Sequence, residues 1–259
     1  MSEWVAITSR DNPLLVRLRK LARTPVGYRK LGAVWLEGEH LCLALRARGR
    51  AALQALVSES ASQQPALCEL ALWAPKTAVV SDALFASVSS LESPAGIGFV
   101  IDAPAPQSLQ PGVPSIVLDR IQDAGNVGSI LRSASALGFT QVLALEGSAA
   151  LWSPKVLRAG MGAHFALELV EGLALHDLEA LGLPLLAGSS HAAHSLDDAD
   201  LPFPCAWAFG HEGQGVSPAL LARCARTVRI PQPGGEESLN VAAAAAICMY
   251  ATRRAGGWQ

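Results

Sequence analysis

Asn126 and Arg132 stand where a strand-like run gives way to a helical pattern, in the segment LDRIQDAGNVGSILRSASALGF. A helix from about residue 126 to 137 would carry one core-facing stripe of apolar side chains: Val127, Ile130, Leu131, Ala134 and Leu137. Arg132 then projects nearly opposite this stripe, where a guanidinium can hold a phosphate or simply remain in solvent. Asn126 can orient a ligand or cap the helix. Gly125 and Gly128 are expected to keep the turn tight, but their spacing differs from that of known phosphate loops.

A glycine-rich loop follows a second strand-like run, CAWAFG, and continues as HEGQG. Its three glycines, Gly210, Gly213 and Gly215, let the backbone approach a bound molecule closely or adopt positive φ. Glu212 lies in the middle of the loop, where a carboxylate can bind a hydroxyl or a cation. A polar turn with one charged residue is the plainer alternative. Ser217 and Pro218 are expected to start the next helix as its N-cap and first residue.

A third loop begins with Pro and Gly residues after the run RTVRI and continues as the acidic and polar string Glu236-Glu237-Ser238-Leu239-Asn240. Such a loop suits a purine and its ribose, because it presents backbone groups beside side-chain acceptors. Its Ser-Leu-Asn part could instead only cap the last helix, which ends near Arg253 and Arg254. Three such loops at the strand ends of one sheet predict a small-molecule site.

The elements that must position these loops alternate along the chain. Short apolar runs predict strands, and helical segments separate them: 115–119, 141–146, 165–170, 184–188, 205–210 and 227–230. This pattern predicts an α/β fold with a mostly parallel sheet and helices on both faces. Ligands of such sheets bind beyond the carboxyl ends of the strands.

A stretch with four prolines, IDAPAPQSLQPGVPS, marks a domain boundary ahead of this sheet. We expect a domain over 1–106, a linker over 107–113 and a second domain over 114–259. Strand-like and helical runs alternate in the first part too, which predicts a small α/β domain.

The first fifty residues are basic, with ten Lys and Arg against four Asp and Glu, although the whole chain has a net charge of −2. A basic start on a mildly acidic chain indicates contact with a polyanion, or else only a solvated helix face. The residues that we expect to contact RNA in that case are Arg10, Arg17, Arg19, Lys20, Arg23, Arg29 and Lys30.

The composition, with 51% hydrophobic and 16% charged residues, favours a folded core and excludes wholesale disorder. No apolar run is long enough to span a membrane, and the start does not resemble a signal peptide, so we expect a cytoplasmic protein. The five cysteines are scattered and odd in number, which argues against disulfides and zinc. His191 and His194 lack a third ligand at suitable spacing, so we expect no metal.

Taken in order, the three loops resemble the three motifs of the SpoU-type (TrmH-family) RNA 2'-O-ribose methyltransferases of the SPOUT class. Asn126-x-Gly128-x-x-x-Arg132 resembles the first motif, and Gly210-x-Glu212-Gly213-x-Gly215 resembles the second. The third motif is matched by Ile230-Pro231, Gly234 and Ser238-Leu239-Asn240-Val241. The resemblance covers essentially all of 113–254.

Two further segments carry the resemblance. The segment SPKVLRAGMGAHFALEL is similar to the one that connects the first two motifs, with Gly160 where members more often have Ser. In the first domain, EGEHLCLAL and SPAGIGFV resemble the ribosomal-protein-like RNA-binding domain that many members carry.

The resemblance implies a C-terminal trefoil knot, an exception to the rule that chains do not thread loops. It also implies a homodimer that binds RNA across both subunits and needs no metal. S-adenosylmethionine would lie bent in the knot, held by Gly210, Glu212, Gly213, Gly215, Ile230, Pro231, Gly234, Ser238, Leu239, Asn240 and Val241.

In this family, the arginine that matches Arg132 is assigned to activating the ribose 2'-OH. A guanidinium is rarely deprotonated, so clamping a phosphate and stabilising the alkoxide rank equal to a role as base. Asn126, Glu212, Ser238 and Asn240 would orient Arg132, the ribose and the cofactor.

The basic first domain favours ribosomal RNA, most simply 23S, over transfer RNA as the substrate. A catalytically inactive RNA-binding or ribosome-assembly factor is the alternative outside enzymes. A nicotinamide-dependent oxidoreductase is disfavoured, because no G-x-G-x-x-G follows the strand at 115–119.

Overall fold

The computed structural model describes residues 3–190, 192–234 and 238–256. The chain divides into two compact units, and each is considered by itself. Unit 1 comprises Met1–Ala105 together with Trp152–Phe165, and unit 2 comprises Pro106–Leu151 and Ala166–Gln259. Sequence patterns place 152–165 in the second domain, whereas in the structure this segment packs with the first.

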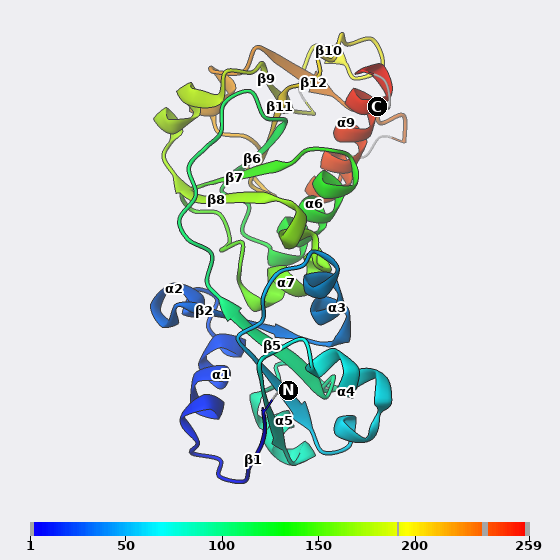
Figure 1. Ribbon diagram of the computed structural model, residues 1–259. Coiled ribbons are helices and arrows are strands. Elements are labelled where there is room, and N and C mark those ends of the chain that lie inside the picture. Colours follow the sequence, from blue (N-terminus) through cyan, green and yellow to red (C-terminus); the bar gives the residue numbers. More distant parts are fainter. Residues whose placement is uncertain (1–2, 191, 235–237, 257–259) are drawn as a thin grey trace. The chain divides into compact units, whose positions relative to one another are not determined.

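Unit 1 is a five-stranded mixed sheet with helices on both sides (Figure 1). Its strands lie in the order β1-β4-β3-β5-β2, and β5 is antiparallel to both β3 and β2. Their bounds are β1 Glu3–Ile7, β2 Ala33–Glu37, β3 Gln54–Ser58, β4 Lys76–Val80 and β5 Ile97–Asp102. The helices are α1 Pro13–Arg23, α2 Gly27–Leu31, α3 Glu39–Ala47, α4 Pro65–Ala71, α5 Asp82–Val88 and α7 Pro154–Gly160.

Local signals account for most of these elements. The side chain of Asn12 accepts a hydrogen bond from the N–H of Leu14 (2.9 Å), so that Pro13 can open α1.

Sequence patterns do not predict β1 or α2. β1 is an edge strand whose side chains Trp4 and Val5 are both exposed, so it lacks the inside–outside alternation by which strands are recognised.

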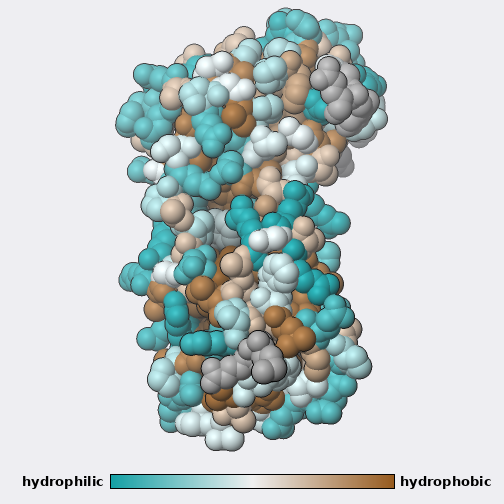
Figure 2. All heavy atoms as spheres, viewed as in Figure 1, coloured by the Kyte–Doolittle hydropathy of each residue, from teal (hydrophilic) through white to brown (hydrophobic). Residues whose placement is uncertain are grey.

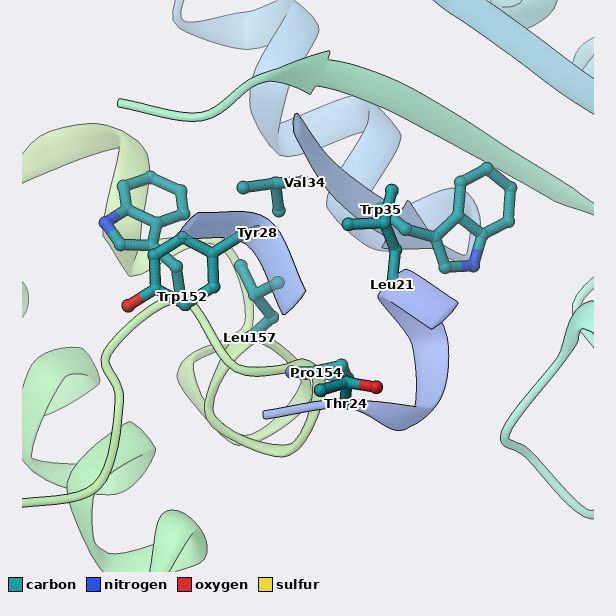
Figure 3. Close-up of a pocket in the computed structure, with 8 residues that line it drawn as sticks. All are labelled: Leu21, Thr24, Tyr28, Val34, Trp35, Trp152, Pro154 and Leu157. Atoms are coloured by element: carbon teal, nitrogen blue, oxygen red, sulfur yellow. The ribbon is translucent and has the colours of Figure 1, made fainter. Parts of the chain in front are cut away.

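The segment Trp152–Phe165 joins unit 1 through apolar packing. Figure 3 shows Trp152, Pro154 and Leu157 facing the same hollow as Leu21 and Val34. The backbone carbonyl of Met161 lies 3.2 Å from His40 Nε2, and Arg158 Nη1 donates to Ser90 Oγ over 2.8 Å. These two polar contacts, just after the apolar residues of the segment, add to its attachment to unit 1.

Unit 2 is a seven-stranded sheet in the order β10-β12-β9-β11-β6-β7-β8. Every described strand pair in it is parallel, which confirms the prediction of a mostly parallel sheet. Its strands are β6 Ser115–Asp119, β7 Gln141–Leu145, β8 Glu168–Leu173, β9 Leu185–Gly188, β10 His194–Ser195, β11 Ala206–Gly210 and β12 Arg226–Arg229. Its helices are α6 Ala124–Ala136, α8 Pro218–Leu221 and α9 Val241–Gly256.

Helices cover both faces of this sheet. α6 and α9 pack side by side on one face, where α9 also contacts β9 and β11 (Figure 1). The 3-10 helix Leu175–Leu181 and α8 supply buried leucines to the other face. Within the residues that the structure describes, no helix has the length and apolar character needed to cross a membrane.

The predicted strand at 165–170 is shifted, since β8 begins only at Glu168. Residues Ala163–Ala166 form a 3-10 turn in which His164 and Phe165 are buried. The rings of both residues pack against Trp152 in unit 1, with centroids 5.1 and 6.4 Å away. The run 165–170 is therefore divided: Phe165 packs in unit 1, and the residues from Glu168 onward form a strand of unit 2.

A hydrogen bond buried between α9 and the sheet is expected to matter for stability. Trp207 Nε1 donates to Thr252 Oγ1 (2.9 Å), and both side chains are fully buried. Thr252→Val leaves the indole N–H without a partner, so the free energy of unfolding should fall by roughly 1–3 kcal/mol in denaturant titrations. Thr252→Ser keeps the hydroxyl and should lose less. Equal losses in the two variants would contradict this role for the hydroxyl.

Candidate functional site

The three loops meet at one edge of the unit 2 sheet. β6 ends at Asp119, β11 ends at Gly210 and β12 ends at Arg229, all at the carboxyl edge. Gly210 is aligned with Asp119 across the β11–β6 pair, and β9 separates β11 from β12. The parallel topology thus brings together segments that are far apart in the sequence, at the edge where ligands of such sheets bind.

A directed chain of hydrogen bonds ties these loops together. Asn240 Nδ2 donates to Asn126 Oδ1 (2.9 Å), and Asn126 Nδ2 donates to Glu212 Oε1 (3.1 Å). Asn240 Oδ1 accepts from the N–H groups of Ala242 and Ala243 at the start of α9. The oxygen of Asn240 already accepts from these N–H groups, so only its amide nitrogen can bond to Asn126. This fixes the orientation of the side-chain amides of Asn240 and Asn126. Asn240 therefore caps α9 and also belongs to the site.

Glu212 is held as a carboxylate. Besides the amide of Asn126, it accepts the N–H of Asp123 (3.1 Å) and of Gln122 (3.4 Å) just before α6. Partial burial raises the pKa of Glu212, but the hydrogen bonds from the side chain of Asn126 and from backbone N–H groups outweigh it. The net result is a lowered pKa. An ionised Glu212 is an acceptor only, so at neutral pH it positions α6 and Asn126.

Removing the Asn126 amide should change this titration. In Asn126→Ala we expect the pKa of Glu212 to rise toward its ordinary value, as seen by NMR titration of the side-chain carboxyl carbon. A lowered folded-state pKa gives stability that is present above the unfolded pKa and lost as the pH falls through the folded value. Because the folded-state pKa of Glu212 is closer to its unfolded value in the variant, this loss should be smaller there and should be complete at a higher pH. Gln214→Ala, in the same loop without a bond to Glu212, is the control, and an unchanged midpoint in Asn126→Ala would contradict the coupling.

Arg132 lies on the exposed side of α6, as its place opposite the apolar stripe predicts. Val127, Ile130, Leu131 and Ala134 are buried beneath it. Its guanidinium has no hydrogen bond or ion pair with any residue that the structure describes. It is thus available to an external anion, and no such bond joins it to the chain of Asn240, Asn126 and Glu212.

The start of α6 differs from the expectation. The helix begins at Ala124, and its N-cap is Asp123, whose Oδ1 accepts from the N–H of Asn126 (2.8 Å). Gly125 and Gly128 therefore lie inside α6 and do not form a turn. Because Asp123, three residues before Asn126, caps the helix, the side chain of Asn126 is free for the site.

Two of the three glycines in the second loop have a structural reason. A Cβ on Gly210 would lie 2.1 Å from the backbone carbonyl of Gly215, and Gly215 itself has φ +67°. The carbonyl of His211 accepts from the N–H of Gly215 (2.8 Å), which closes a tight loop. A Cβ on Gly213 would meet nothing closer than the ring of His211 at 3.8 Å.

The third loop is only partly described. Ile230, Pro231 and Gly234 lead away from β12, and Ser238 and Leu239 lead into α9 at Val241. Gly235, Glu236 and Glu237 lie outside the described residues, as does His191. Of the described residues of this loop, Asn240 is the one whose side chain bonds to the first loop, at Asn126, and Asn126 in turn bonds to Glu212 of the second loop. A Cβ on Gly234 would meet no atom within 4 Å, so its backbone is open on that side.

Asp119 and Arg120 also belong to this edge, although the motifs did not include them. Asp119 is buried, and its carboxylate accepts from Arg120 Nε (3.0 Å) and from the N–H of Ser217 (2.6 Å). Arg120 has a left-handed backbone (φ 59°), and its Nη1 donates to Gln214 Oε1 (3.1 Å). These bonds tie β6 to the glycine-rich loop. Ser217 is the N-cap of α8 by position, but its side chain makes no capping bond. The sequence signal that could have identified Asp119 is its position, because it is a charged residue at the end of an apolar, strand-like run.

The seven basic residues predicted to contact RNA separate into two groups in unit 1. Four arginines bind their own unit: Arg17 to Leu31 O, Arg19 to Arg10 O, Arg23 to Ser87 O, and Arg29 to the hydroxyl and ring of Tyr28. Arg10, Lys20 and Lys30 are exposed. The role of all seven residues in binding RNA stays a prediction.

Comparison with known proteins agrees with this geometry. A tRNA/rRNA methyltransferase of Synechocystis sp., itself uncharacterized, is 31% identical over 98% of this chain and 95% of its own length. The 23S rRNA (guanosine(2553)-2'-O)-methyltransferase RlmP of Bacillus subtilis is 29% identical over 86% of this chain and 90% of its own. The SpoU methyltransferase AviRb of Streptomyces viridochromogenes, solved in complex with the cofactor AdoMet, is 23% identical and covers 94% of this chain and 97% of its own. It superposes with a TM-score of 0.84.

The fold of AviRb extends over both units of this chain. Residues 114–250, which carry all three loops, match the SpoU rRNA Methylase family. With an all-parallel sheet whose carboxyl edge gathers Asn126, Glu212 and Asn240, this chain belongs to the SpoU rRNA Methylase family.

Proposed function

We propose that this protein transfers a methyl group from S-adenosylmethionine to a ribose 2'-OH of ribosomal RNA. The observation that carries the proposal is the chain of hydrogen bonds from Asn240 through Asn126 to Glu212, which locks three loops around one strand edge. Family membership and the 23S rRNA activity in the name of the Bacillus relative support the reaction and the RNA class.

The cofactor would be held by the second and third loops. Gly210 and Gly215 shape the first of these. A Cβ on Gly213 would meet only the ring of His211, at 3.8 Å, and one on Gly234 would meet no described atom within 4 Å. Leu239, which follows Gly234 in the third loop, exposes an apolar side chain, and such a side chain suits the face of an adenine ring. Ile230, Pro231, Ser238 and Val241 complete the predicted set. These features fit S-adenosylmethionine, whose sulfonium supplies an activated methyl group.

The protein's part in the reaction is alignment and charge control. The ribose oxygen must approach the methyl carbon in line, so that the new C–O bond forms as the C–S bond breaks, and the hydroxyl proton must leave. Arg132 would hold the RNA phosphate beside the ribose and stabilise the developing alkoxide, or accept its proton. Asn126, Glu212, Ser238 and Asn240 would orient the reacting groups.

We assign residues 1–106 to a ribosomal-protein-like RNA-binding domain, 107–113 to a linker and 114–259 to the methyltransferase domain, of which the segment Trp152–Phe165 packs in unit 1. We further propose that the third loop and α9 complete a trefoil knot and that the protein is a cytoplasmic homodimer. The exposed residues Ala243, Ile247 and Tyr250 follow one side of α9 at helical spacing and would suit a second copy of the chain.

Transfer of tritiated methyl groups to purified 23S rRNA and to bulk tRNA tests the proposal. Incorporation into 23S rRNA, recovered as a 2'-O-methyl nucleoside by mass spectrometry, is the expected result. Greater incorporation into tRNA would overturn the RNA class. Recovery of a base-methylated nucleoside would overturn the reaction itself.

A further inference from the structure

Unit 1 exposes two of its tryptophans near the end of α4. Trp4 on β1 is 38% exposed and Trp73 just after α4 is 40% exposed, whereas Trp35 and Trp152 in the same unit are buried. Leu72, next to Trp73, is 57% exposed. Figure 2 shows apolar residues, in brown, exposed among hydrophilic ones on the visible face of the protein. Large apolar side chains gathered at the surface are a feature of binding sites.

Strand register places these side chains on the same side of the sheet. Trp4 is aligned with Thr77 on the neighbouring parallel strand, so both point to the same face. The hydroxyl of Thr77 donates to the carbonyl of Ala71 (3.4 Å), the last residue of α4, which identifies that face as the one covered by α4. Leu72 and Trp73 follow Ala71 directly, so they emerge on the face to which Trp4 belongs.

The turn that carries Arg48 and Arg50 lies beside Trp73. Trp73 Nε1 donates to the carbonyl of Arg50 (2.9 Å), which fixes the orientation of the indole and places the Arg48–Arg50 turn against it. Both arginine side chains are exposed, and neither has a hydrogen bond or ion pair with the residues that the structure describes. Trp4, Leu72, Trp73, Arg48 and Arg50 are called the tryptophan patch below.

The surrounding charges leave the patch positive. Arg46 on α3 is paired with Glu69 on α4, with 3.6 Å between Arg46 Nη1 and Glu69 Oε1. Lys76, at the start of β4, and Asp102, at the end of β5, lie at the same end of the sheet and carry opposite charges. Among the described residues, Arg48 and Arg50 therefore have no anionic partner. The N–H of the neighbouring Trp73 indole is already hydrogen-bonded to a carbonyl.

We propose that the tryptophan patch binds unpaired nucleotides of the RNA substrate, with bases stacked on Trp73 and Trp4 and phosphates held by Arg48 and Arg50. The inference rests on the proposed function for the identity of the ligand class. Flat rings beside unpaired arginines match single-stranded RNA, because stacking takes the base and guanidinium groups take the phosphate. The patch does not include the seven basic residues predicted from the sequence.

Binding of a labelled single-stranded oligoribonucleotide and of its duplex to the full chain tests the patch. Trp73→Ala should weaken single-strand binding roughly tenfold or more, while Trp73→Phe, which keeps a ring but not the indole N–H, should stay within about threefold of wild type. Arg50→Ala should lower the slope of log affinity against log salt by about 0.7. Arg46→Ala, which removes a charge already paired with Glu69, is the matched control and should have little effect.

Several outcomes would overturn this inference. Unchanged affinity in Trp73→Ala would exclude stacking, and an equal loss in Trp73→Phe would show that the indole only holds the Arg48–Arg50 turn. Tighter binding of the duplex than of the single strand would also contradict it. Methyl transfer separates this failure from that of the proposed function. If wild type transfers methyl groups, Arg132→Ala does not and Trp73→Ala is unaffected, only the proposal about the tryptophan patch is contradicted. If wild type transfers no methyl groups to RNA, the proposed function itself is contradicted.

Discussion

Replacing Arg132 with alanine is expected to lower the rate of methyl transfer to RNA by at least about a hundredfold, the scale on which general bases and charge-stabilising groups act. The side chain is exposed on α6 and bonds to no residue that the structure describes, so its removal should leave the fold intact. Incorporation of tritiated methyl groups into 23S rRNA measures the rate, and thermal unfolding checks the fold.

Two further variants sharpen the interpretation. Ser129→Ala, at an exposed position of the same helix, should behave like wild type. Arg132→Lys keeps a positive charge but loses the planar fork, so partial activity would favour a phosphate clamp with simple charge stabilisation. Incorporation by Arg132→Ala at the wild-type rate would remove Arg132 from the reaction.

Replacing Gly210 with alanine should damage both the stability and the cofactor site. The new Cβ would lie 2.1 Å from the carbonyl of Gly215, so the loop must move. We expect the free energy of unfolding to fall by roughly 1–3 kcal/mol, as for other overpacked sites. Affinity for S-adenosylmethionine should fall at least about tenfold, because the loop no longer closes. Denaturant titration and calorimetry measure the two effects.

Gly213→Ala is the matched control for stability, because its Cβ would approach only the ring of His211, at 3.8 Å. Its free energy of unfolding should stay within about 0.5 kcal/mol of wild type. If the two variants were equally destabilised, loss of glycine flexibility would explain the effect better than the close approach at Gly210.

Much of the site could be predicted because its signals are local. Buried parallel strands are continuous apolar runs, and the run before Asp119 and the run before Gly210 both became strands of one sheet. Helical periodicity alone placed Arg132 opposite the buried face of α6. The loops after these strands then had to meet at the carboxyl edge, since the strands are parallel.

Other features required the folded chain. The bonds from Asn126 to Asn240 and to Glu212 span 114 and 86 residues. The segment Trp152–Phe165 belongs to unit 1 although it lies between elements of unit 2. Arg17 and Arg23 look like RNA ligands in a basic helix, yet they bind carbonyls of Leu31 and Ser87.

The sequence by itself therefore determined the strands that precede the three loops, the helical face of Arg132 and the residue types of these loops. These depend on the alternation of polar and apolar side chains over a few neighbouring residues. Only the tertiary structure decided that Asn240 orients Asn126, that Asp119 and Arg120 brace the glycine-rich loop, and that Trp73 stands beside Arg50. Strand order and register set these pairs, and residues distant in sequence become partners only when the sheet brings their ends together.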